Sequence, residues 1–378
     1  MIKPQDFFEL LAKKGICFYT GVPDSLLKEF CSFVNDNVKA RDHIITANEG
    51  GAVALASGYY LATGSPALVY MQNSGIGNSI NPLLSLADPE VYSIPMLLLV
   101  GWRGEPGKKD EPQHIKQGKV MLKLFDSIEI DYAVLGETIQ EAVEVVDEAV
   151  RVIKEKNCPY VIAVREGTFE KYPLAETGES EFELSREEAI ELVLQSLEEN
   201  DIVVSTTGKA SREVFEYRKT NSQGHEKDFL TVGSMGHSSQ IALGIALSKP
   251  DSRVINLDGD GSVIMHMGSM AVIGTTAPQN LVHIVLNNGA HESVGGQPTA
   301  GFLIDLPKIA TACGYKISMS AVNAQELFSA IDILSKTQGP VFLEIRVNKQ
   351  SRKDLGRPDS SPKENKKSFM KFLGNETD

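Results

Sequence analysis

Carboxylate and carboxamide side chains follow two apolar runs in the second half of the chain. The run 254–258 ends in Gly259-Asp260-Gly261, and the run 281–286 ends in Asn287-Asn288. The side chains are hard oxygen ligands of the kind that bind Mg²⁺, and glycine lets the backbone approach a phosphate group closely. These residue types predict a site for Mg²⁺ shared with a diphosphate, provided that the chain brings the two segments together.

A strand–helix–strand unit brings such segments together. Each apolar run has the length of a buried strand, and a helix is expected between them over 263–274, with Ser262 as its cap. Strands joined by a crossover helix run parallel, so their carboxyl ends meet at one edge of a sheet, where open α/β sheets bind ligands. Asp260 and Asn288 are therefore expected side by side.

Another carboxylate lies at a strand-to-helix junction in the first half of the chain. The expected strand 44–47 leads into Glu49, which opens a helix of small residues that ends near Gly64. A carboxylate at this position stabilises the positive end of the helix dipole, and for an isolated residue that is the simpler explanation.

The spacing of both sets of residues resembles that of the thiamine-diphosphate (ThDP) enzyme family. Gly259-Asp260-Gly261 is separated from Asn287-Asn288 by 25 residues, as in the metal-binding signature of that family. In the first half, the spacing Glu-x2-Ala-x3-Ala-x-Gly-x5-Gly of the pyrimidine-binding domain is matched by Glu49, Ala52, Ala56, Gly58 and Gly64.

The resemblance implies a role for each of these residues. Mg²⁺ is bound by the side chains of Asp260 and Asn288 and by the backbone carbonyl of Ala290. Glu49 bonds N1′ of the aminopyrimidine and thereby promotes loss of the proton from C2 of the thiazolium. That chemistry needs a carboxylic acid with a raised pKa in a site closed to water.

Further candidate residues lie on the turns at the same sheet edges. The additional residues expected to contact the cofactor are Asn73, Thr207, Gly208, Met235, Gly259, Gly261 and Ser262. By the resemblance, Met235 is the apolar wedge that bends the cofactor, although a single methionine is also a common core residue.

The candidate substrate contacts are polar residues on loops. They are Asp24, Ser25, Arg103, Lys209 and Arg212. Asp24 and Ser25 are equally suited to cap the helix that follows them. The loop 101–109 around Arg103 is basic and is expected to act as a lid or as an ordinary solvated loop. His114 is a candidate proton donor, with an exposed surface position as the alternative.

Composition limits the class of protein. The chain has 378 residues, a formal net charge of −13 and four scattered cysteines. The negative charge argues against nucleic acid and anionic membranes as partners, and an anionic substrate therefore requires a local basic pocket. The cysteine pattern is typical of a reduced, cytoplasmic protein, and neither a signal peptide nor a membrane span is predicted.

The expected architecture is α/β, with two ThDP-binding-fold domains that each contain a parallel sheet flanked by helices. The predicted parts are a pyrimidine-binding domain (1–168), a polar linker (169–184), a diphosphate- and Mg²⁺-binding domain (185–348) and a C-terminal tail (349–378). Within the tail, 365–373 is expected to form a docking helix. The resemblance also implies a homodimer or larger homo-oligomer, with each cofactor held between two chains.

Within the ThDP enzymes, the chain is most similar to the compact two-domain decarboxylases of phosphonopyruvate and sulfopyruvate. The matching segments are Gly-Val-Pro-Asp-Ser-Leu-Leu (21–27), Gly-Trp-Arg-Gly-Glu-Pro-Gly (101–107), Asp-Glu-Pro-Gln-His (110–114) and Asn-Gly-Ala-His-Glu-Ser-Val-Gly-Gly-Gln (288–297). Sulfopyruvate decarboxylase is often split into two subunits, so a fused chain favours phosphonopyruvate, with sulfopyruvate or another 2-oxo acid as the alternative.

The implied reaction is the non-oxidative decarboxylation of 3-phosphonopyruvate, a small anionic 2-oxo acid, to phosphonoacetaldehyde and CO₂ in phosphonate biosynthesis. Two other classes of protein are consistent with parts of the sequence. Asp-Gly-Asp-Gly also resembles the motif of haloacid-dehalogenase-like phosphatases, with Asp258 as the nucleophile. A non-catalytic ThDP-binding partner is the second alternative.

Overall fold

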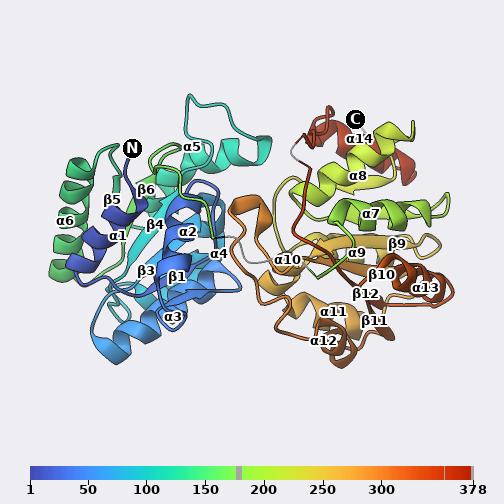
Figure 1. Ribbon diagram of the computed structural model, residues 1–378, viewed down its shortest axis with the longest axis horizontal. Helices are drawn as coiled ribbons and strands as arrows, with labels where there is room; N and C mark the ends of the chain where they lie inside the picture. Colours follow the sequence, from blue (N-terminus) through green and yellow to red (C-terminus); the bar gives the residue numbers. More distant parts are fainter. Residues whose placement is uncertain (176–180, 353, 376–378) are drawn as a thin grey trace. The chain divides into compact units, whose positions relative to one another are not determined.

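The computed structural model describes residues 1–175, 181–352 and 354–375. The chain forms two compact units (Figure 1). The first comprises Met1–Thr177 together with His291–Gln297, and the second comprises Gly178–Ala290 and Pro298–Asp378. The short segment His291–Gln297 thus groups with the first unit, although it lies within the expected span of the second domain.

The first unit is built on a six-stranded parallel sheet with the strand order β2-β1-β3-β4-β6-β5. Its strands are β1 (Tyr19–Gly21), β2 (His43–Ile45), β3 (Leu68–Gln72), β4 (Leu97–Gly101), β5 (Tyr132–Val134) and β6 (Tyr160–Val164). Its helices are α1 (Pro4–Lys13), α2 (Lys28–Asn37), α3 (Glu49–Thr63), α4 (Ile76–Pro82), α5 (Pro112–Ser127) and α6 (Ile139–Lys156), with short helical turns η1 (Asn73–Gly75) and η2 (Leu83–Ala87).

Helices cover both faces of this sheet. Successive side chains of a strand point to opposite faces, so β3 contributes to two cores. Leu68 and Tyr70 pack in the core that includes α1, α2 and α6, whereas Val69 and Met71 pack in the core that includes α3, α4 and α5. Burial on both faces explains why the central strands are continuous apolar runs rather than alternating ones.

The second unit repeats this plan with the strand order β11-β12-β10-β9-β7-β8, again all parallel. Its strands are β7 (Ile202–Ser205), β8 (Asp228–Leu230), β9 (Val254–Gly259), β10 (Leu281–Asn287), β11 (Ile317–Ala321) and β12 (Val341–Arg346). Its helices are α7 (Arg186–Gln195), α8 (Lys209–Thr220), α9 (Ser238–Ser248), α10 (Asp260–Met265), α11 (Gly268–Thr276), α12 (Leu306–Cys313), α13 (Ala324–Ser335) and α14 (Pro362–Phe372). The short helical turn η3 (Glu292–Val294) lies between β10 and α12 in the chain but groups with the first unit.

The C-terminal helix docks on the second unit, as expected for the 365–373 segment. Phe369 of α14 is buried in the core that includes α9, α11 and α12. The Asn365 side chain donates to the backbone carbonyl of Asp228 at 2.9 Å and accepts from the backbone N–H of Leu230 at 3.3 Å. This amide therefore pairs with backbone groups of the edge strand β8.

The predicted fold class is confirmed, and three details differ. One helix was predicted over 263–274, but the structure has two. The first, α10, already begins at Asp260, and the second, α11, follows it. Ser262 therefore lies inside α10 and is not a cap. The short strands β5 and β8 were not predicted. No helix in the described parts of the chain is both long and apolar enough to cross a membrane.

Candidate active site

Glu49 begins α3 and its carboxylate is buried in the first unit. The side-chain amide of Asn78, in α4, donates to Glu49 Oε2 at 2.7 Å. The carboxylate also packs against the backbone of Gly75, where an added Cβ would lie 2.2 Å from Glu49 Oε1. This side chain is therefore fixed in position by two elements besides its own helix, which a simple helix-terminus acid does not require.

Asp24 lies beyond the end of β1 and is fully buried. Its carboxylate accepts a hydrogen bond from Gln72 Nε2 at 2.6 Å and from the backbone N–H of Leu26 at 3.0 Å. Burial raises the pKa of Asp24, and these hydrogen bonds partly oppose that effect. Because α2 begins only at Lys28, with Leu27 at its N-cap and no side-chain cap, the alternative in which Asp24 or Ser25 caps that helix is wrong.

The Arg103 guanidinium makes two hydrogen bonds to Asp110, one of them from Nε at 2.8 Å, and a further bond from Nη1 to Ser25 Oγ at 2.8 Å. Burial alone would raise the pKa of Asp110, but the bonds from Arg103 and from the backbone N–H groups of Glu111 and Gly104 lower it well below its usual range. The basic charge of the loop 101–109 is thus partly neutralised by Asp110, the residue that directly follows it.

The start of the loop, 101–104, is held against α5, whereas 106–109 are exposed to solvent. Trp102 is buried, and its indole N–H donates to the carbonyl of Gly118 at 2.9 Å. An added Cβ at Gly118 would lie 1.9 Å from the carbonyl oxygen of Gly104, so the two backbones are in close contact. Glycine is needed at this position because no larger residue fits.

His114 and Asn73 present buried polar atoms close to this cluster. The surface alternative for His114 is wrong, because it lies on α5 and is buried. Burial lowers the pKa of His114, and the charge of Arg103 acts in the same direction, so the imidazole is neutral near pH 7. Asn73 donates to the carbonyl of Arg103 at 2.7 Å. In the described structure, His114 Nδ1 and Asn73 Oδ1 have no hydrogen-bond partner.

Asp260 and Asn288 meet at the carboxyl edge of the second sheet, as expected from the parallel pairing of β9 with β10. Burial raises the pKa of Asp260 to about 6, although hydrogen bonds from Thr299 and from the backbone N–H groups of Gly261 and Asn288 act in the opposite direction. The Asn288 side-chain oxygen accepts from the backbone N–H of Ala290 at 3.1 Å.

The predicted diphosphate contacts surround the start of α10. Thr207 and Gly208 precede α8, and Gly208 adopts a positive φ of 95° as its N-cap. Gly259 and Gly261 flank Asp260. Ser262 instead makes internal contacts: its hydroxyl lies 3.1 Å from Thr206 Oγ1 and accepts from the backbone N–H of Gly236 at 3.0 Å. The serine therefore joins three turns.

Met235 is half-buried and lies outside the hydrophobic clusters of the described residues. The core-packing alternative for this side chain is therefore wrong. Lys209, at the start of α8, donates to Ser351 Oγ, and Arg212 is half-buried one turn further along the same helix. Both basic residues lie on the second unit, whereas Arg103 lies on the first.

The buried position of Asp258 excludes the phosphatase interpretation. Asp258 is 1% exposed; its carboxylate accepts from the backbone N–H of Gly259 at 2.9 Å and lies 3.4 Å from His283 Nε2. A nucleophile must reach its substrate, and this carboxylate is enclosed in the sheet.

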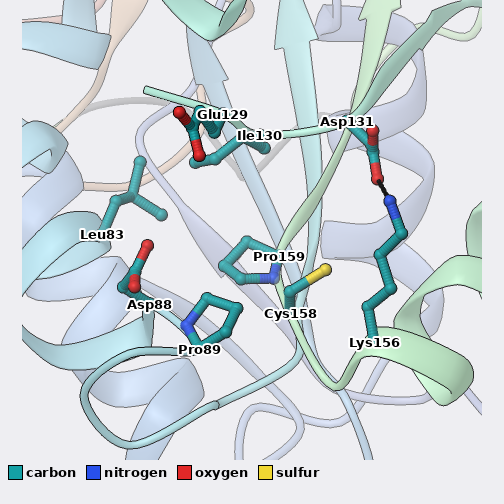
Figure 2. A pocket seen from close by; sticks show the side chains of 9 residues that line it. All are labelled: Leu83, Asp88, Pro89, Glu129, Ile130, Asp131, Lys156, Cys158 and Pro159. Carbon is teal, nitrogen blue, oxygen red and sulfur yellow. Dashed lines mark hydrogen bonds and ion pairs between the residues drawn. The ribbon is translucent and has the colours of Figure 1, made fainter. Parts of the chain in front are cut away.

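A pocket of about 250 Å³ lies at the amino ends of the strands of the first sheet, opposite the edge that carries the predicted site residues (Figure 2). Its lining includes Glu129 and Asp131, which precede β5, and Cys158 and Pro159, which precede β6. Burial raises the pKa of the Cys158 thiol, so this sulfur is a poor nucleophile. The pocket contains none of the predicted site residues.

The donor set of the second unit fits Mg²⁺ bound with a diphosphate. Asp260 is a buried carboxylate that has no cationic side chain paired with it among the residues described. Such a carboxylate is costly to ionise without a compensating positive charge, which a metal ion supplies. Carboxylate, carboxamide and carbonyl oxygens are also the ligands that Mg²⁺ prefers.

Comparison with known proteins assigns both halves of the chain to one family. The N-terminal TPP binding domain of thiamine pyrophosphate enzymes matches residues 4–127, and the C-terminal TPP binding domain matches residues 206–345. Thiamine pyrophosphate is another name for ThDP.

The full-length relatives are decarboxylases. A phosphonopyruvate decarboxylase of Streptomyces viridochromogenes is 34% identical over 99% of this chain and 95% of its own length. A phosphonopyruvate decarboxylase of Streptomyces hygroscopicus is 34% identical over 98% of this chain and 94% of its own. A sulfopyruvate decarboxylase of Methanosarcina acetivorans is 27% identical over 99% and 98%, respectively. The chain belongs to the family of thiamine-diphosphate-dependent decarboxylases.

Proposed function

We propose that the chain decarboxylates 3-phosphonopyruvate to phosphonoacetaldehyde and CO₂, with ThDP and Mg²⁺ as cofactors. The observation that supports this substrate is the 34% identity to two proteins named phosphonopyruvate decarboxylase over nearly the whole chain. Sulfopyruvate is the second candidate, since a named sulfopyruvate decarboxylase also matches nearly end to end. That match corrects one step in the sequence argument: a fused chain does not favour the phosphonate, because this sulfopyruvate enzyme spans both halves as well.

Glu49 is the proposed catalytic acid. Bound ThDP would supply a nucleophilic C2 carbon for the 2-oxo group and, in its thiazolium ring, an acceptor for the electron pair released with CO₂. Glu49 holds a proton at N1′ of the aminopyrimidine, and the Asn78 amide keeps the carboxyl group oriented for that contact. A positioned acid–base group of this kind typically contributes about 10²–10⁴-fold to a rate.

The proposed substrate contacts in the first unit are Asp24, Ser25 and Arg103, which one hydrogen-bond cluster joins. Arg103 is suited to an anionic headgroup because its guanidinium binds phosphonate oxygens in a fixed fork. Asp110 orients that fork from the opposite side. His114, with its neutral imidazole, is the proposed proton carrier, and Lys209 and Arg212 are proposed as further counter-charges.

The proposed metal ligands are the side chains of Asp260 and Asn288 and the carbonyl of Ala290, with the surrounding glycine turns against the diphosphate. Met235 is proposed as the apolar support that bends the cofactor. We accordingly assign pyrimidine binding to 1–168 and diphosphate binding to 185–348, with 169–184 as the linker and 349–378 as the tail.

The proposed assembly is a homodimer or larger homo-oligomer with shared active sites. Three helices of small and apolar residues leave large apolar side chains exposed: Leu61 of α3 (72% exposed), Leu247 of α9 (55%) and Val272 of α11 (48%). An amphipathic surface helix would turn polar residues to solvent, so these faces favour coverage by a second chain. The proposed cytoplasmic location is supported by four free cysteines.

CO₂ release from phosphonopyruvate, sulfopyruvate and pyruvate tests this proposal, with each substrate assayed with and without ThDP and Mg²⁺. We expect the highest kcat/KM for phosphonopyruvate and no release without the cofactors. A higher kcat/KM for sulfopyruvate would move the assignment to the second candidate. ThDP binding without CO₂ release from any substrate would identify a non-catalytic partner.

A further inference from the structure

We infer that Glu344 is a positioning residue that holds the metal ligands Asp260 and Asn288 in place, an inference that rests on the metal site proposed above. Glu344 lies on β12, next to β10 in the sheet, and its side chain is fully buried. Both of its carboxylate oxygens accept hydrogen bonds from protein side chains. A series of hydrogen bonds leads from this carboxylate to the two proposed metal ligands.

Three side chains donate to the buried carboxylate. Asn287 Nδ2 donates to Glu344 Oε1 at 2.7 Å, and Ser320 Oγ donates to Oε2 at 3.0 Å. Arg346 Nε donates to the same Oε2 at 3.3 Å. A buried carboxylate must be satisfied in this way to be tolerated. The two oxygens are divided: one faces the metal-site strand β10, and the other faces the outer part of the sheet.

Asn287 extends the network into both segments of the metal site. Its Nδ2 also donates to the carbonyl of Gly301 at 2.9 Å, and its Oδ1 accepts from the backbone N–H of Gly289 at 3.0 Å. The side chain is 0% exposed. Asn287 therefore holds the backbone that follows Asn288 and reaches across to Gly301.

Gly301 and Thr299 complete the connection to Asp260. The Gly301 N–H donates to Thr299 Oγ1 at 3.0 Å, and the Thr299 hydroxyl donates to Asp260 Oδ2. An added Cβ at Gly301 would lie 2.6 Å from Asp260 Oδ2 and 2.5 Å from Asn287 Oδ1. The backbone at Gly301 is thus packed directly between the metal ligand and the side chain that Glu344 holds.

In this geometry Glu344 supports the metal site through one atom, Oε1, which accepts the hydrogen bond from Asn287. Partners that orient metal ligands typically affect metal affinity by about 10–100-fold when they are removed. Without that acceptor, one Asn287 N–H loses its partner in the dry interior, and the loops at Gly289 and Gly301 lose a common support.

Glu344→Gln and Glu344→Met separate the acceptor from the volume of the side chain. Gln retains a carbonyl oxygen for Asn287, and its NH₂ group can donate to Ser320 Oγ. Met has a similar size and offers no comparable acceptor. Calorimetry on the full-length protein should give a ThDP dissociation constant, at fixed Mg²⁺, within about 3-fold of the parent for Gln and roughly 10–100-fold weaker for Met. The Mg²⁺ dissociation constant, measured at fixed ThDP, should change in the same way.

Ser320→Ala is the matched control, because it removes a bond to the same carboxylate on the side away from the metal site. It should lower the melting temperature of the cofactor-free protein without changing ThDP affinity. Asn287→Leu removes the hydrogen bond between Asn287 and Glu344 from the Asn287 side. It should weaken ThDP binding as much as Glu344→Met does, and it replaces that variant in the test if Glu344→Met does not fold.

Two results would overturn the inference. The first is a ThDP affinity in Glu344→Met and Asn287→Leu that equals that of the parent. The second is a loss of ThDP affinity that is equally large in Glu344→Gln and Glu344→Met. A parent protein that binds ThDP independently of Mg²⁺ would instead refute the metal site itself, and this inference with it.

Discussion

Gly75→Ala is expected to displace the Glu49 carboxylate without altering that residue. Gly75 has a φ of −78°, which alanine adopts readily, so the backbone itself is not strained by the change. The new Cβ would lie 2.2 Å from Glu49 Oε1, 2.4 Å from Cδ and 2.6 Å from Cγ. All three atoms belong to one side chain, so Glu49 must move or α4 must shift away from it.

The size of the displacement follows from these distances. A carbon and an oxygen in ordinary contact lie about 3.4 Å apart, so the carboxylate must move by more than about 1 Å. A misplacement of about 1 Å in a catalytic group can reduce a rate by 10²-fold. We therefore expect kcat to fall by about 10²-fold, within the 10²–10⁴-fold range for complete loss of a general acid or base.

Exchange of the ThDP C2 proton with D₂O, followed by NMR in the bound state, is the direct assay. Gly75→Ala should slow this exchange about as much as it slows CO₂ release. Gly77→Ala is the matched control: Gly77 lies two residues further along, in the first turn of α4, has no atom within 4 Å of its added Cβ, and should leave both rates near those of the parent when substituted. Parent-like exchange in Gly75→Ala would refute the role assigned to Glu49.

Three further substitutions test other parts of the site. Asp260→Ala should abolish Mg²⁺-dependent ThDP binding in calorimetry, and an unchanged affinity would contradict the metal assignment. Arg103→Ala should raise KM for phosphonopyruvate by roughly 10–150-fold, the loss of a charged hydrogen bond, and affect pyruvate much less. An equal effect on both substrates would assign Arg103 to the carboxylate or to the loop. Co-expression of Glu49→Ala chains with Asp260→Ala chains should restore about a quarter of wild-type activity if sites are shared across a two-fold interface, and no recovery in verified mixed dimers would refute sharing.

The strands β9 and β10 and the turns that follow them were predictable because both strands are largely apolar runs. Such runs mark strands buried on both faces, and the crossover rule then places their polar ends at one edge. The strands β5 (Tyr132–Val134) and β8 (Asp228–Leu230) were missed, and each has only three residues at the edge of a sheet. So short a segment contains no readable alternation of apolar and polar residues. The equally short edge strand β2 (His43–Ile45) was predicted ahead of the helix that Glu49 begins.

The supporting residues of the site were not predictable from spacing. Asn78 reaches Glu49 across 29 residues, and Thr299 reaches Asp260 across 39. Such partners depend on how separate elements pack, which no local pattern records. Ser262 shows the converse: it has the residue type of a cap, but α10 begins two residues earlier and its hydroxyl bonds to other turns. A buried hydroxyl takes whichever partners the tertiary packing supplies.

Phosphorus NMR of phosphonopyruvate incubated with the full-length protein tests the central claim most directly. With ThDP and Mg²⁺ present, the substrate resonance should be replaced by that of phosphonoacetaldehyde, with one equivalent of CO₂ released for each molecule consumed. Omission of ThDP should leave the substrate unchanged. Persistence of phosphonopyruvate under conditions in which the same preparation decarboxylates sulfopyruvate would contradict the proposed function.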